Sequence, residues 1–106
     1  MDPLQRVRLG PTDLEVTRVG LGCAPLGGLY SDISDEQAAE VVRTGLGAGI
    51  NFLDTAALYG AGHSERRVGM ALDGVDRDSY VLATKAGWRF DHVAGPSNFS
   101  ETFDSP

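Results

Sequence analysis

Short apolar runs alternate with polar, turn-forming stretches along most of the chain. Residues 6–9 and 14–17 are two such runs, separated by Gly10-Pro11-Thr12-Asp13. Turn formers between two short strand-like runs predict a β-hairpin. The short run at 50–54 is mostly apolar and ends on a charge, which is typical of a strand buried on both faces. Three further strands are therefore expected, at residues 19–22, 50–54 and 80–84.

Two helices are expected between these strands. The first begins after Ser34, because a serine followed three residues later by Gln37 forms a capping box, and Gly47 and Gly49 end it. Its apolar positions recur at helical spacing and predict one buried face, made of Ala38, Val41, Val42, Gly45 and Leu46. The second helix is expected over residues 64–72, with its apolar side made of Val68, Ala71 and Leu72.

The order of elements predicts an α/β fold. A hairpin is followed by β-α-β-α-β, and strands that alternate with helices imply a parallel sheet with right-handed crossovers. Residues 89–106 show no periodicity, since their phenylalanines are scattered among Gly, Pro, Ser, Asn and Asp. We therefore expect an organised segment over 1–88 and an irregular loop or disordered tail over 89–106.

Composition narrows the class of protein. The chain has 106 residues, of which 42% are hydrophobic, and its net charge is −6. It has no basic patch, which argues against nucleic acid and anionic membranes as partners. The longest uncharged run, residues 19–31, is interrupted by glycines and too short to span a bilayer. A single cysteine, Cys23, excludes an internal disulfide and suits a reducing cytoplasm.

Charged residues close the two later predicted strands. Asp54 ends one strand, Lys85 ends the next, and Tyr59 lies in the loop after Asp54. Because reactive groups in parallel α/β sheets gather at the carboxyl ends of strands, we expect the three side chains to converge. An ammonium close to a phenol stabilises the phenolate, which tunes a proton donor and acceptor for a carbonyl/alcohol pair. Each residue alone also fits a structural cap or a solvated charge; the combination favours function.

A long motif surrounds these residues. Residues 49–65 read Gly-Ile-Asn-Phe-Leu-Asp-Thr-Ala-Ala-Leu-Tyr-Gly-Ala-Gly-His-Ser-Glu, and the run resembles the signature of the aldo-keto reductase family. Residues 9–16 are similar to the family's opening hairpin, 19–22 to its first barrel strand and 83–87 to its third. The resemblance covers residues 6–88. It is strongest to bacterial members that act on sugars, such as fucose or aldose dehydrogenases.

The resemblance implies a (β/α)8 barrel that uses NADP(H) or NAD(H) to reduce an aldehyde, ketone or sugar, or to oxidise the alcohol. By position, Tyr59 is implied as the general acid/base, Lys85 as its partner, and Asp54 as the partner of the lysine and a neighbour of the nicotinamide ribose. The loop Gly22-Cys23-Ala24 is implied to line the cofactor. For the Cys23 side chain we favour a buried, small apolar role over thiol chemistry, and no metal site is expected.

One member of the family's catalytic set, a histidine at the end of the fourth strand, has no counterpart. We interpret His63 and His92 as surface residues. A barrel of this kind needs about 200–250 residues, so the chain is expected to form its N-terminal part, with the barrel incomplete. Unpaired sheet edges then predict self-association. Two alternatives stay open: an inactive remnant or interaction module on the same scaffold, and a generic three-stranded α/β binding domain.

Overall fold

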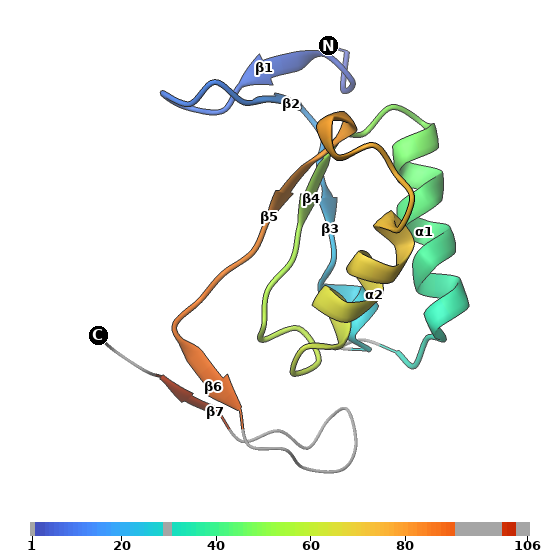
Figure 1. Cartoon of the computed structure of the whole chain (residues 1–106), viewed down its shortest axis with the longest axis vertical. Helices are drawn as coiled ribbons and strands as arrows, with labels where there is room; N and C mark the ends of the chain where they lie inside the picture. Colours follow the sequence, from blue (N-terminus) through green and yellow to red (C-terminus); the bar gives the residue numbers. More distant parts are fainter. Residues whose placement is uncertain (1, 29–30, 91–100, 104–106) are drawn as a thin grey trace.

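The computed structural model describes residues 2–28, 31–90 and 101–103. Figure 1 shows a hairpin at one end of a small sheet, two helices beside that sheet, and a second strand pair further along the chain. The elements are β1 (Arg6–Arg8), β2 (Glu15–Thr17), β3 (Leu21–Gly22), the 3-10 turn η1 (Ala24–Gly27), α1 (Asp35–Gly47), β4 (Phe52–Asp54), α2 (His63–Leu72), the 3-10 turn η2 (Arg77–Ser79), β5 (Val81–Ala83), β6 (Trp88–Phe90) and β7 (Glu101–Phe103).

The expected hairpin is present. β1 and β2 pair antiparallel, with Val7 opposite Val16. Gly10 adopts a φ of 54°, a left-handed conformation that glycine reaches without steric cost. The Thr12 hydroxyl donates a hydrogen bond to the Leu9 carbonyl at 2.6 Å and stabilises the turn. The turn residues between the two apolar runs therefore predict this element correctly.

Three parallel strands form the central sheet, in the order β3-β4-β5. Both helices lie beside one face of this sheet (Figure 1). Leu53 in the middle of β4 is fully buried, whereas Phe52 and Asp54 are only half-buried. The expectation that this strand is buried on both faces is therefore wrong. Adjacent side chains alternate between faces, and within the described residues only the Leu53 face is covered by helices.

α1 begins with the expected capping box. The backbone amide of Gln37 donates a hydrogen bond to Ser34 Oγ at 3.1 Å, and the backbone amide of Ser34 donates one to Gln37 Oε1 at 2.9 Å. Ala38 and Val42 are fully buried, but Val41 is 45% exposed, so its placement on the buried face is wrong. α2 packs against α1.

The core lies between the helices and the sheet. Its members come from β4, from both helices and from the turn after β3, so that segments far apart in sequence are joined by apolar contact. The buried cluster consists of Cys23, Leu26, Ala38, Val42, Leu53, Val68, Ala71 and Leu72. The apolar side predicted for the second helix is thus confirmed.

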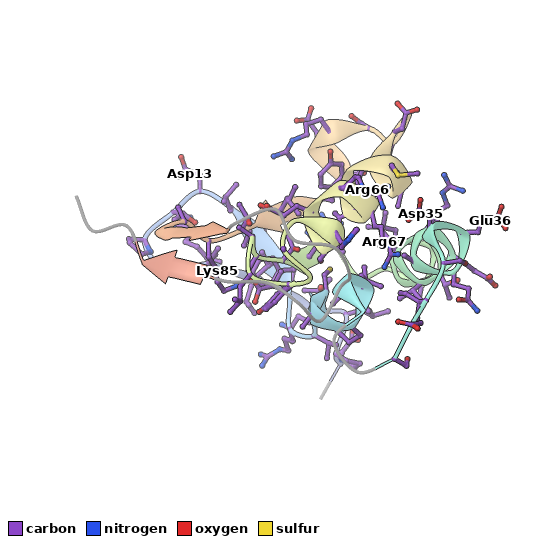
Figure 2. The ribbon with its side chains drawn as sticks, turned by 90° about the horizontal axis from the view of Figure 1, so that it is seen from below. Asp13, Asp35, Glu36, Arg66, Arg67 and Lys85 are labelled. Atoms are coloured by element: carbon purple, nitrogen blue, oxygen red, sulfur yellow. The ribbon has the colours of Figure 1, made fainter. Side chains whose placement is uncertain are left out.

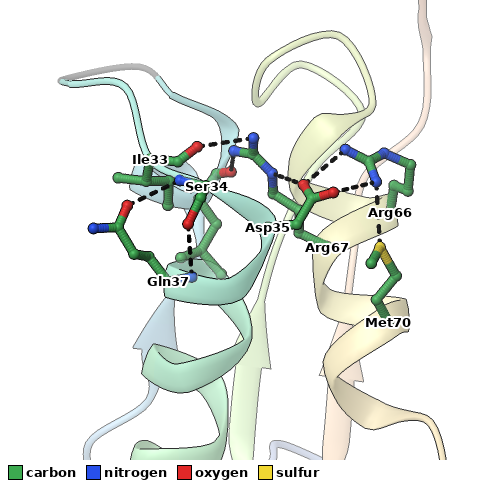
Figure 3. Close-up of polar contacts among 8 residues, drawn as sticks. Ile33, Ser34, Asp35, Gln37, Arg66, Arg67 and Met70 are labelled. Atoms are coloured by element: carbon green, nitrogen blue, oxygen red, sulfur yellow. Dashed lines mark hydrogen bonds and ion pairs between the residues drawn. The ribbon is translucent and has the colours of Figure 1, made fainter.

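An ion-pair cluster joins the first turns of α1 and α2 (Figure 3). Asp35 Oδ1 lies 3.0 Å from an Arg66 terminal nitrogen and 2.9 Å from Arg67 Nε. The same Arg67 guanidinium donates to the Leu26 carbonyl at 2.6 Å and to the Ile33 carbonyl at 3.0 Å. The Arg67 side chain of α2 therefore binds η1, the loop before α1 and the first residue of α1.

Replacing Asp35 with asparagine is expected to lower the melting temperature at neutral pH. Hydrogen bonds from Arg66 and then Arg67 lower the pKa of Asp35 from 3.8 to about 2. A carboxyl whose pKa is lower when folded stabilises the fold above its unfolded pKa, and that stability is lost as pH falls. The melting difference between wild type and Asp35→Asn should therefore shrink between about pH 4 and about pH 2. A difference that is constant over this range contradicts the assignment.

The segment expected to be irregular contains a strand pair. Trp88–Phe90 and Glu101–Phe103 pair antiparallel, with Trp88 opposite Phe103. The expectation of an irregular tail over 89–106 is wrong for these residues, and 91–100 and 104–106 lie outside the described part of the chain. Each of these strands has three residues, which are too few to show a hydrophobic period in the sequence. The two strands also lie far apart along the chain, so neighbouring residues do not indicate that they pair.

Candidate active site

The carboxyl ends of the three parallel strands bring the candidate residues to one rim. Gly22, Asp54 and Ala83 are in register across β3, β4 and β5. Asp54 is the last residue of β4, and Lys85 follows the end of β5 by two residues. Figure 2 shows Lys85 well apart from the Asp35–Arg66–Arg67 cluster on the helices. Among the described residues, the Asp54–Lys85 ion pair at the strand ends is therefore separate from the ion pairs on the helices.

Lys85 is held by two oxygens at the end of β4. Its Nζ donates to Asp54 Oδ1 at 2.8 Å and to the Thr55 carbonyl at 3.0 Å. The hydrogen bond to Asp54 raises the pKa of Lys85 above its usual value of 10.5, so the amine is an ammonium throughout the neutral range. Both side chains of the pair are about half exposed, 50% for Lys85 and 49% for Asp54, and solvent weakens an ion pair of this kind.

Tyr59 reaches the same rim from the loop after β4. Lys85 Nζ lies 5.2 Å from the centroid of the Tyr59 ring, within the range of a cation–π contact. The loop turns back on itself through a hydrogen bond from the Tyr59 amide to the Ala56 carbonyl at 3.2 Å. Tyr59 and Lys85 line a small hollow of about 100 Å³ with Ala56, Ala57 and Leu58. A carboxylate, a phenol and an ammonium thus meet beside a space open to a small molecule.

The Tyr59 loop touches η1 backbone to backbone. A Cβ added to Gly27 would lie 2.5 Å from both the carbonyl carbon and the carbonyl oxygen of Tyr59. Gly60 on the other side of the contact has a φ of 68°, a conformation that favours glycine. No side chain fits between these segments, so the two glycines set how closely the Tyr59 backbone approaches the turn after β3.

The three residues of the loop expected to line a cofactor, 22–24, differ in their exposure to solvent. Gly22 is exposed, and a Cβ placed there would meet no atom within 4 Å. Ala24 is half-buried. The Cys23 side chain is fully buried, and burial is the main reason that its pKa rises to about 11. Cys23 is therefore a core residue, as the sequence interpretation favoured, and its thiol does not face a ligand.

Two buried hydroxyls at this rim were not identified from the sequence. Thr55 and Ser64 lie 2.6 Å apart, oxygen to oxygen, and both are almost completely buried. A signal was available, because Ser64 occupies the same helical face as Val68, Ala71 and Leu72, where a polar residue needs a hydrogen-bond partner.

Of the two histidines, His63 alone lies in the described part of the chain. His63 is exposed, as expected, and His92 lies outside the described residues. Within residues 2–28, 31–90 and 101–103, no three His, Cys, Asp or Glu side chains are grouped to hold a metal ion. No helix in that part of the chain has the length and apolar character needed to cross a membrane.

Known proteins resemble this chain in sequence. Residues 18–102 match the profile of the aldo/keto reductase family. L-galactose dehydrogenase from Arabidopsis thaliana is 38% identical over 89 residues, which cover 82% of this chain and 28% of that protein. D-threo-aldose 1-dehydrogenase from a Pseudomonas species is 42% identical over 74 residues, covering 70% of this chain and 22% of that protein.

Solved structures agree as well. The holo form of an aldo-keto reductase from Bacillus halodurans superposes with a TM-score of 0.78 at 37% identity, covering 94% of this chain and 30% of that one. An aldo-keto reductase from Klebsiella pneumoniae in complex with NADPH gives a TM-score of 0.60 at 33% identity, covering 68% of this chain and 24% of that one.

These neighbours are (β/α)8 barrels, and the described strands and helices form an open portion of that fold. The chain spans less than a third of the length of the two sugar dehydrogenases and of the Bacillus halodurans enzyme. The family expected from residues 49–65 is confirmed on both sequence and structure. This chain belongs to the aldo/keto reductase family.

Proposed function

We propose that the protein is an NAD(P)(H)-dependent oxidoreductase and that this chain provides the proton-transfer part of its active site. The observation that carries the proposal is the convergence of Asp54, Tyr59 and Lys85 at the strand ends. Lys85 Nζ is hydrogen-bonded to Asp54 and lies 5.2 Å from the Tyr59 ring centroid. This arrangement provides an ionisable hydroxyl beside a cation held by a carboxylate.

Each residue has a distinct task in carbonyl reduction. A reduced nicotinamide, when bound, would supply the hydride needed at the carbonyl carbon. Tyr59 donates its phenolic proton to the carbonyl oxygen as the C=O π bond breaks, which yields the alcohol and a phenolate. The Lys85 ammonium stabilises that phenolate, and Asp54 keeps Lys85 charged and oriented. Alcohol oxidation runs the same proton transfer in reverse.

An open position at the end of β3 supports a cofactor site there. Gly22 is exposed with open space where a side chain would be, and the half-exposed Asp54 carboxylate is its register partner. We propose that Asp54 and the backbone of Gly22 to Ala24 border the nicotinamide side of the cofactor. Because Cys23 is buried, its contribution is limited to the backbone.

For the substrate we propose a small aldehyde or an aldose. The hollow beside Tyr59 and Lys85 is about 100 Å³, which suits a carbonyl group and a few neighbouring atoms. Two of the similar proteins are by name sugar dehydrogenases, one for L-galactose and one for D-threo-aldoses. The polar rim formed by Asp54 and Lys85 is consistent with a hydroxylated substrate.

The test is turnover by the full-length protein. Consumption of NADPH or NADH is measured with a simple aldehyde, and formation of the reduced cofactor is measured with a panel of aldoses. The proposal predicts turnover with at least one substrate and quenching of protein fluorescence on cofactor binding. Folded protein that neither binds either cofactor nor turns over any substrate would contradict it and favour the inactive-scaffold alternative.

A further inference from the structure

Two buried hydroxyl groups connect three segments of the rim. Thr55, directly after β4, is 2% exposed, and Ser64, in the first turn of α2, is fully buried. Their oxygens are 2.6 Å apart, and Ser64 Oγ lies 2.8 Å from the Cys23 carbonyl oxygen. Among the described residues, no buried side-chain nitrogen or oxygen lacks a hydrogen-bond partner.

The donor and the acceptor of each hydrogen bond follow from the number of protons that each group carries. A serine hydroxyl has one proton, and a backbone carbonyl only accepts. Ser64 therefore donates to the Cys23 carbonyl, and its remaining lone pair accepts from the Thr55 hydroxyl. The hydrogen bonds therefore run in one direction, from Thr55 to Ser64 to Cys23. Removal of the Ser64 hydroxyl leaves the buried Thr55 hydroxyl without its acceptor, while the Cys23 carbonyl keeps the Leu26 amide as a donor at 3.1 Å.

Each of these three hydrogen-bonded residues also contacts a candidate catalytic residue through its own backbone. The Thr55 carbonyl accepts from Lys85 Nζ at 3.0 Å. The Ser64 amide donates to the Tyr59 carbonyl at 3.1 Å, and the Cys23 amide donates to the Asp54 carbonyl at 2.9 Å. The two hydroxyls thus join the backbone segments that carry all three candidate catalytic side chains.

We propose that Thr55 and Ser64 are positioning residues that hold the Tyr59 loop and the Lys85 amine in one geometry at the end of β4. This inference rests on the proposed function. The two residues touch backbone and each other, so they act through Tyr59 and Lys85 rather than on the substrate.

The rim needs such support because its ion pair is open to solvent. Lys85 and Asp54 are each about half exposed, and exposed ion pairs hold side chains weakly. Buried hydroxyls that are hydrogen-bonded one to the next are far less free to rearrange than an exposed ion pair, since each lost hydrogen bond leaves a buried polar group unsatisfied. A displacement of about 1 Å at a catalytic group costs about 100-fold in rate, so a small loosening here is measurable.

The experiment compares variants in the full-length protein. Ser64→Ala is expected to lower kcat by about tenfold to 100-fold, with little change in the KM for cofactor. Thr55→Val should lower kcat less, because Ser64 still reaches the Cys23 carbonyl, and Thr55→Ser should restore it. Thr17→Val is the matched control: Thr17 is also 2% exposed and hydrogen-bonded to Val19 and Asn51, but at the opposite end of β4. It should reduce stability and leave kcat unchanged.

The double variant tests whether the hydroxyls act as one unit. Because the Thr55 hydroxyl reaches the rest of the rim only through Ser64, Thr55→Val combined with Ser64→Ala should have the kcat of Ser64→Ala alone. Multiplied effects would show that the two residues act independently. An unchanged kcat in Ser64→Ala, or an equal loss in Thr17→Val, would also overturn the proposal.

A second readout does not depend on turnover. Asp54 and then Tyr59 raise the pKa of Lys85. The Lys85 signal is followed by NMR in protein with isotope-labelled lysine and is assigned by its loss in Lys85→Arg. The signal should titrate at lower pH in Ser64→Ala than in wild type, and at the wild-type pH in Thr17→Val. If the wild type turns over no substrate, the proposed function fails while this titration still decides the positioning role; identical titrations in Ser64→Ala and wild type would refute it.

Discussion

Replacing Tyr59 with phenylalanine is expected to lower kcat for carbonyl reduction by about 10²–10⁴-fold, the usual contribution of a positioned general acid. The substitution removes one oxygen and keeps the ring, so the contact with Lys85 and the hollow of about 100 Å³ should persist. Cofactor affinity, measured by fluorescence quenching, is expected to stay close to that of wild type. A loss of kcat with intact binding identifies the phenol as the proton donor.

The matched control for this variant is Tyr80→Phe. Tyr80 precedes β5, at the opposite end of the sheet from Lys85, and its ring also lies near a cation, with Arg77 at 4.7 Å from the centroid. The same chemical change there should leave kcat unaltered. Equal losses in the two variants, or a Tyr59→Phe protein with wild-type turnover, would remove Tyr59 from the mechanism.

Replacing Lys85 with methionine should lower kcat by about 100-fold or more, because the phenolate formed at Tyr59 loses the cation that stabilises it. The methionine retains an unbranched chain of similar length, and half of the lysine side chain is exposed, so the change in stability should be small. kcat, KM and the melting temperature are measured together. A large loss of kcat without a fall in melting temperature separates a catalytic role from a structural one.

Two further substitutions sharpen this test. Arg77→Met removes a cation from beside the Tyr80 ring and should not affect turnover. Lys85→Arg retains the charge but replaces a compact ammonium by a planar guanidinium with a different donor geometry. We expect it to recover part of the activity. If methionine and arginine at position 85 behave alike, charge at this position is not what the reaction requires.

Local signals in the sequence predict most of the fold. The capping box at Ser34, the turn at residues 10–13 and the alternation of strands and helices are each decided by neighbours a few residues apart. The same holds for the candidate site, since strand ends in a parallel sheet share one edge, and this alone places Asp54 and Lys85 together. The exposed Val41 and the half-buried Phe52 were not predictable, because their exposure depends on which elements cover them.

The contacts around the site were less accessible to sequence reasoning. The pairing of Thr55 with Ser64, the carbonyl partners of Arg67 and the close approach of Gly27 to Tyr59 each join segments that lie 9 to 41 residues apart. Hydrogen-bond direction and backbone approach depend on distances of a few tenths of an ångström, and residue types alone do not specify them. The β6–β7 pair was missed for a related reason, since three residues of one strand carry too little pattern to indicate a partner.

The amino-acid sequence by itself determined the order of strands and α-helices up to β5, the parallel sheet, the family and the three side chains at its rim, because these follow from periodicity and from a long contiguous motif. Only the tertiary structure decided that Lys85 also binds the Thr55 carbonyl, that Gly27 and the Tyr59 backbone approach closely, and that two buried hydroxyls connect the segments carrying the site. The physical reason is that burial and hydrogen-bond partnership are properties of packed segments, and they arise only when distant parts of the chain meet.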